Sequence, residues 1–126
     1  MTTEGKRILV VEDDVTLRET LTEVFLDEGH EVRAAAHGSE ALDHLDGWEP
    51  DLIVLDLMMP TMDAFAFRAR QRELGVAADA RTVVISAARD LGSAVEILEA
   101  DSWIAKPFLL AEVVEVVDRL LASPEG

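Results

Sequence analysis

The feature that most constrains the fold of this chain is a regular alternation of five short apolar runs with five amphipathic stretches. Each apolar run is predicted to be a β-strand, and the runs cover residues 8–11, 31–35, 52–55, 82–86 and 103–105. Continuous apolar runs are typical of strands buried on both faces. The strict alternation therefore predicts a parallel sheet with helices on both faces and right-handed crossovers.

The amphipathic stretches have the periodicity of helices. After the first strand, Leu17, Leu21, Val24 and Phe25 fall on one helical face, and Gly29 provides a stop signal. Further helices are predicted at residues 39–46, in a segment that carries Phe65, Phe67 and Leu74, at about 94–99, and at 110–122. Trp48 lies in a loop before the third strand, where we expect it to be a partly exposed cover.

Composition narrows the class of protein. The chain has 126 residues, which is the size of one ordinary domain, with 49% hydrophobic and 29% charged residues. Its net charge of -15 disfavours direct binding to nucleic acid or to an anionic membrane, and favours a cation or a basic partner. The absence of cysteine excludes disulfides and thiol chemistry. No segment resembles a secretory signal or a membrane span, so we expect a cytoplasmic protein.

Polar residues collect where the predicted strands end. In open α/β sheets, ligands bind outside the carboxyl ends of the strands. The residues at or just after these ends carry carboxylate, hydroxyl and ammonium groups: Glu12, Asp13, Asp14, Asp56, Ser86 and Lys106. The sequence therefore predicts that these groups converge at one edge of the sheet.

This set of groups suits phosphoryl transfer to an aspartate. Crowded carboxylates favour a hard cation, and Mg²⁺ is typically held by one or two carboxylates, waters and a phosphate oxygen. An aspartate can act as the nucleophile, a lysine can neutralise a phosphoryl oxygen, and a serine hydroxyl can hydrogen-bond another. The alternative is structural: the acids at 12–14 would cap the first helix, and Asp56 would be a turn residue.

Four stretches, taken together and in this order, resemble the response-regulator receiver family of the CheY-like superfamily. They are residues 8–14 with Leu17-Arg18, residues 50–60 with Met62-Asp63, Ser86-Ala87, and residues 106–108. The resemblance covers residues 6–122 as one receiver domain, with flexible ends at 1–5 and 123–126. It implies a single-domain, flavodoxin-like α/β fold whose five-stranded parallel sheet has the order 2-1-3-4-5.

The resemblance also implies a role for each matching residue. Asp56 would be the phosphoacceptor and, with Asp13, would bind Mg²⁺ or Mn²⁺ directly. Glu12 would reach the cation through water, and the backbone carbonyl of Met58 would complete the protein ligands. Ser86 and Lys106 would bind the phosphoryl oxygens, and Trp103 would be the aromatic side chain that turns inward when Ser86 moves.

The function that the resemblance implies is signalling. A histidine kinase or histidine phosphotransfer protein would donate the phosphoryl group, and the face of the fourth helix, fifth strand and fifth helix would pass the change to a downstream effector. The chain would catalyse only its own phosphorylation and dephosphorylation, and a homodimer through the last two helices is compatible with it. Two alternatives stay open: a degenerate receiver that binds partners without phosphorylation, and a metal-dependent phosphatase. The phosphatase is disfavoured because Met58 replaces the acid that could protonate a leaving group.

The chain departs from the family pattern in three ways that bear on structure. Ala64 and Glu99 each stand where the family usually has glycine, and Ala64 would be costly if its position required a positive φ. The interval from Ser86 to Lys106 is shorter than in many receivers. Trp103 is bulkier than the usual tyrosine or phenylalanine.

Overall fold

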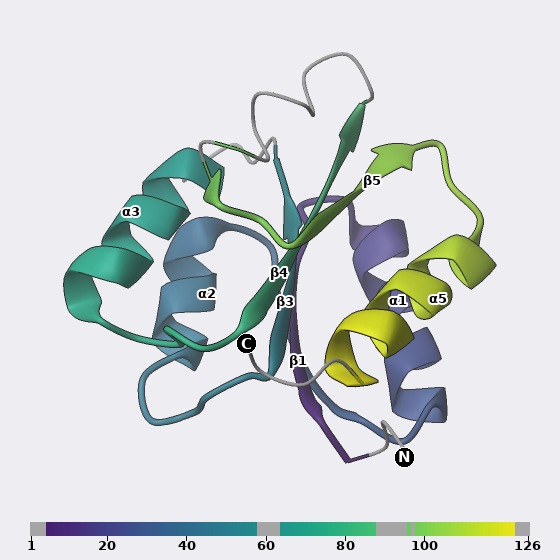
Figure 1. Cartoon of the computed structure of the whole chain (residues 1–126), viewed down its shortest axis with the longest axis horizontal. Coiled ribbons are helices and arrows are strands. Elements are labelled where there is room, and N and C mark those ends of the chain that lie inside the picture. Colours follow the sequence, from purple (N-terminus) through teal and green to yellow (C-terminus); the bar gives the residue numbers. More distant parts are fainter. Residues whose placement is uncertain (1–4, 58–63, 88–95, 97, 123–126) are drawn as a thin grey trace.

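The computed structural model describes residues 5–57, 64–87, 96 and 98–122 (Figure 1). Its five strands are β1 (Arg7–Val11), β2 (Glu31–Ala35), β3 (Leu52–Asp56), β4 (Arg81–Ala87) and β5 (Ser102–Lys106). All neighbouring pairs are parallel, and the order across the sheet is β2-β1-β3-β4-β5. The strand order expected from the family resemblance is confirmed.

Helices cover both faces of the sheet. Figure 1 shows α1 (Val15–Asp27) and α5 (Leu110–Ala122) on one face, and α2 (Gly38–His44) and α3 (Ala64–Leu74) on the other. Of the helix predicted at about residues 94–99, residues 94, 95 and 97 lie outside the described residues, and residues 96 and 98 are helical. Within the described part of the chain, the fold is the doubly wound α/β arrangement that the alternation predicted. None of the helices described there has the length and apolar character needed to cross a membrane.

Alternate residues of the same strands build two separate cores. Successive side chains of a strand point to opposite faces, so each central strand needs apolar residues at every position. Leu9, Val11, Ile53 and Leu55 pack on the α2 and α3 side. The other core, between the sheet and helices α1 and α5, contains Ile8, Val10, Leu52, Val54, Val83, Ile85, Val113 and Val117. This two-sided packing explains the continuous apolar runs.

The expectation for Trp48 was wrong. Its side chain is only 4% exposed, and its Nε1 donates a hydrogen bond to Glu31 Oε2 at 2.7 Å. The guanidinium carbon of Arg33 lies 4.6 Å from the centre of the indole ring, which is a cation–π contact. The edge strand β2 supplies both partners, and that pairing of a loop with a strand could not be seen in the local sequence.

The two positions where glycine is usual behave differently. Ala64 is the first residue of α3 and is not among the residues with positive φ, so alanine carries no backbone cost there. Glu99, just before β5, has a φ of 55° and so lies in the left-handed region that favours glycine. The loop into β5 is therefore strained at one residue.

Candidate functional site

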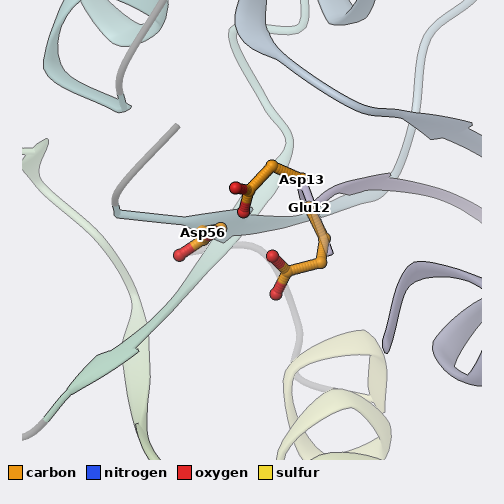
Figure 2. A group of neighbouring side chains, drawn as sticks. All are labelled: Glu12, Asp13 and Asp56. Carbon is orange, nitrogen blue, oxygen red and sulfur yellow. The ribbon is translucent and has the colours of Figure 1, made fainter. Parts of the chain in front are cut away.

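Three of the four acidic residues predicted to converge, Glu12, Asp13 and Asp56, do so where β1 and β3 end. Val11 pairs with Leu55 in the parallel register, which brings Glu12 and Asp13 beside Asp56. The three side chains can each offer one carboxylate oxygen such that all three oxygens lie within 4.8 Å of one another. Figure 2 shows the three carboxylates turned toward a common space. The geometry is that of a candidate metal site made only of oxygen donors.

Burial differs sharply within this trio. Glu12 is fully buried and Asp56 is 3% exposed, whereas Asp13 faces the solvent. Glu12 Oε2 accepts a hydrogen bond from the backbone N–H of Asp14 at 3.2 Å. Burying carboxylates side by side is costly without positive charge nearby.

Lys106, the last residue of β5, supplies part of that charge. Its Nζ lies 3.1 Å from Glu12 Oε1 and 3.7 Å from Asp56 Oδ1. The contact between Lys106 Nζ and Glu12 Oε1 is a close ion pair with a buried carboxylate. One ammonium group thus faces three carboxylates, and the cluster keeps an excess of negative charge.

The pKa values of these groups reflect that excess. Burial, followed by hydrogen bonds to Glu12 and Asp13, raises the pKa of the Asp56 carboxyl to about 8. The hydrogen bond with Asp56 is the largest cause that lowers the pKa of Asp13. Burial alone would lower the pKa of the Lys106 ammonium group, but Asp56 and Glu12 outweigh burial and the pKa is raised. The metal-free site therefore tends to hold a proton at Asp56, in the place where a cation would neutralise it.

The donor set fits a hard divalent cation. Mg²⁺ and Mn²⁺ prefer carboxylate and carbonyl oxygens, and the trio offers oxygen from all three members. Glu12 Oε1 is buried and faces Lys106 Nζ at 3.1 Å, but this one ammonium group is shared with Asp56, so the three carboxylates together keep a net negative charge. Met58, whose carbonyl was predicted as a further ligand, lies outside the described residues.

Ser86 lies in β4, the strand next to β3, and Trp103 lies in the edge strand β5 beyond it. Asp56 pairs with Ile85 in the register of β3 and β4, so Ser86 is the next residue past Asp56 on the neighbouring strand. Ser86 is buried, and its register partner is Ala105 on β5. Trp103 is 55% exposed, so its ring lies on the surface.

The structural alternative for the acidic run holds for one residue. Asp14 is the N-cap of α1, and its Oδ1 accepts a hydrogen bond from the Leu17 N–H at 3.0 Å. Glu12 and Asp13 instead face Asp56. The run of three acids thus divides into a cap and a pair directed at the site.

Arg18 has no role that the sequence predicted, but its side chain lies against the backbone of the acidic pair. Arg18 Nη1 donates hydrogen bonds to the backbone carbonyls of Glu12, at 2.9 Å, and Asp13, at 3.4 Å. The sequence feature that could have indicated this contact is an arginine about one turn into the helix that follows the acids, since its long side chain can reach back to them. Its folding back onto the loop depends on the side-chain conformation, which the sequence does not specify.

Comparison with known proteins places the chain in a family. The family described as the response regulator receiver domain matches residues 8–118, so the chain belongs to the response-regulator receiver family. Relatives include the response regulator MprA of Mycobacterium sp. (strain KMS), which is 37% identical over 94% of this chain and 53% of its own length. The probable transcriptional regulator ycf27 of Cyanophora paradoxa is 34% identical over 96% of this chain and 50% of its own length. The chain spans about half the length of these curated relatives.

Solved structures agree with the fold and the family. The response regulator TrrA of Thermotoga maritima, solved in complex with Mg(2+)-BeF, is 33% identical with a TM-score of 0.78, and covers 91% of this chain and 98% of its own. A putative response regulator from Chloroflexus aurantiacus is 31% identical with a TM-score of 0.82, and covers 95% of this chain and 100% of its own. The chain is thus a receiver domain of the two-component response-regulator type.

Proposed function

We propose that this receiver accepts a phosphoryl group on Asp56 from a histidine kinase or a histidine phosphotransfer protein, in a reaction that depends on Mg²⁺ or Mn²⁺. The observation that carries the proposal is the convergence of Glu12, Asp13 and Asp56 within 4.8 Å, with Lys106 Nζ 3.7 Å from Asp56. Family membership supports it, as does TrrA, a relative that was solved in complex with Mg(2+)-BeF.

The acids have different duties in this proposal. Asp13 and Asp56 hold the cation directly, and the solvent-exposed position of Asp13 supports its role. Glu12 acts through water, because its Oε2 is already bonded to the Asp14 N–H and its Oε1 faces Lys106. The backbone carbonyl of Met58, which lies outside the described residues, would be the remaining protein ligand. When bound, the cation neutralises the phosphoryl oxygens and the crowded carboxylates.

The reaction depends mainly on how the side chains are placed around the phosphoryl group. A carboxylate oxygen of Asp56 attacks phosphorus, the phosphorus–nitrogen bond of the donor phosphohistidine breaks, and its electron pair returns to the imidazole. Lys106, already beside Asp56, pairs with a phosphoryl oxygen, and Ser86 donates a hydrogen bond to another. Proton release from Asp56 precedes attack, because only the carboxylate is nucleophilic.

The outcome is a two-state switch rather than turnover. Movement of Ser86 toward the phosphoryl group opens space into which Trp103 turns, and this changes the surface around β5 and α5. That surface is read by an effector, in the same chain or a separate one, or by a second receiver in a homodimer. The receiver acts in the cytoplasm, without direct contact with nucleic acid or a membrane. New contacts made in only one state are what a population shift requires.

Tryptophan fluorescence tests the proposal. Trp48 is buried against Arg33 and Trp103 is exposed, so the variant Trp48→Phe leaves one reporter at the proposed switch. Mg²⁺ and then beryllofluoride or a small phosphodonor are added to this variant. We expect a change that needs the cation and that disappears when Asp56→Ala is added. Steady phosphate release from assorted monoesters would favour a phosphatase, and no response in either assay would favour a degenerate receiver.

A further inference from the structure

Arg18 is the charged side chain of α1 that reaches back to the acidic pair. One nitrogen, Nη1, donates to both the Glu12 carbonyl at 2.9 Å and the Asp13 carbonyl at 3.4 Å. These are the backbone groups of the two residues whose side chains face Asp56. Arg18 itself is half-buried, so its guanidinium is held against the loop rather than extended into solvent.

The other contacts of this loop fix different atoms. The Glu12 N–H donates to the Ala35 carbonyl at 3.0 Å, which extends the β1–β2 pairing by one residue. The Asp14 N–H donates to Glu12 Oε2, and Asp14 Oδ1 caps the Leu17 N–H. These bonds orient the Glu12 side chain and start the helix. Arg18, from the first turns of α1, adds side-chain hydrogen bonds to the carbonyls of Glu12 and Asp13. These bonds limit rotation of the peptide units on either side of Asp13.

We infer that Arg18 is a positioning residue for the cation, which holds the backbone of Glu12 and Asp13 so that both carboxylates face Asp56. The inference rests on the proposed function and deepens it. Asp13 needs such support most, because its side chain is exposed and lacks the packing that holds Glu12 and Asp56. Groups that orient metal ligands in this way commonly change metal affinity by an order of magnitude or more when removed.

Charge and position predict opposite results for loss of Arg18. A guanidinium beside an acidic cluster repels a divalent cation, so on charge alone its removal would strengthen Mg²⁺ binding. If Arg18 acts by position, its removal weakens binding even though a repulsive charge has gone. The sign of the change therefore separates the two roles.

The test is calorimetric titration of the metal-free full chain with MgCl₂. We expect Arg18→Met to raise the Kd for Mg²⁺ about tenfold. Because a single nitrogen serves both carbonyls, Arg18→Lys is expected to recover most of the affinity. The matched control is Arg70→Met, which removes the same charge from the surface of α3, where Arg70 pairs with Glu73 at 2.6 Å. The control is expected to bind Mg²⁺ like the wild type.

Thermal unfolding of the metal-free variants accompanies the titration, and a tenfold weaker affinity in a variant of unchanged Tm supports positioning. Equal or tighter binding by Arg18→Met overturns the inference, as does a failure of Arg18→Lys to recover affinity. If Arg18→Met does not fold, Arg18→Gln and Arg18→Lys are compared with the wild type under the same criteria. Absence of Mg²⁺ binding by the wild type would count against the proposed function itself.

Discussion

At the scale of single residues, the buried carboxyl of Asp56 makes the fold dependent on pH. Its pKa in the metal-free fold is about 8, because of burial and then the hydrogen bonds to Glu12 and Asp13, against 3.8 for a free aspartate. The folded state thus holds a proton that the unfolded state releases in this interval. The free energy of unfolding contributed by Asp56 falls as the pH rises from about 4 to about 8.

The variant Asp56→Asn is therefore expected to be more stable than the wild type at pH 8 without metal. The gain is on the order of 2 kcal/mol, because the amide cannot ionise but keeps the shape of the side chain. Below about pH 4 the difference should vanish, because the wild-type carboxyl is then protonated in both the folded and unfolded states. Urea unfolding in EDTA at pH 8, 6 and 4 measures it. Coincident unfolding curves at pH 8 would contradict the explanation.

Cation binding and proton binding should compete at the same residues. Mg²⁺ requires ionised carboxylates, so its stabilising effect depends on the loss of the Asp56 proton. We expect a fixed Mg²⁺ concentration to raise the Tm of the wild type more at pH 8 than at pH 6. Asp13→Asn should abolish most of this rise, and Asp14→Asn, which changes the cap but not the pair, should preserve it. An equal rise in both variants would argue against Asp13 as a ligand.

At the scale of secondary-structure elements, Arg68 of α3 binds the backbone of Leu98 and Glu99, in the segment that leads into β5. Its Nε donates to the Leu98 carbonyl at 2.9 Å, Nη1 to Thr82 Oγ1 at 3.2 Å, and Nη2 to the Glu99 carbonyl at 3.3 Å. Burial lowers the pKa of its guanidinium, which marks a charge held partly out of water. The left-handed residue Glu99 is thus fastened from α3.

Loss of the Arg68 hydrogen bonds should lower the free energy of unfolding more than loss of an exposed arginine. We expect Arg68→Met to lower the free energy of unfolding by about 2–3 kcal/mol, because several partly buried acceptors lose a charged donor. Arg70→Met, which breaks an exposed ion pair on the same helix, should cost less than about 0.5 kcal/mol. Urea denaturation of both variants measures the difference. Equal losses would show that the Arg68 hydrogen bonds contribute little.

At the scale of the whole molecule, the sequence predicted the features that depend on the periodicity of apolar residues and on the place of polar residues along the chain. Apolar runs such as residues 52–55 predicted the buried strands, and the common edge of a parallel sheet predicted the meeting of Glu12, Asp13 and Asp56. The pairing of an individual loop side chain with a distant strand could not be predicted. The burial of Trp48 depends on a partner from β2, and that partner is fixed only when the sheet is assembled.

The limits differ for the rest of the site. The division of the acidic run into the cap Asp14 and the pair before it depends on where α1 begins, and helix boundaries are poorly specified by sequence alone. The backbone contacts of Arg18 depend on its side-chain conformation. The roles of Ser86, Lys106 and Trp103 remain predictions that rest on the family resemblance and on their places in the sheet.

The strand order distributes the charged groups of the site unequally. Glu12, Asp13 and Asp56 extend from β1 and β3, which are each bonded to strands on both sides, whereas Lys106 extends from β5, which pairs with β4 at the edge of the sheet formed by the described residues. An edge strand is displaced more easily than a central strand, because backbone hydrogen bonds hold it on one side. We therefore expect a change of charge at Asp56 to displace the edge strand that carries Lys106 more readily than β1 or β3.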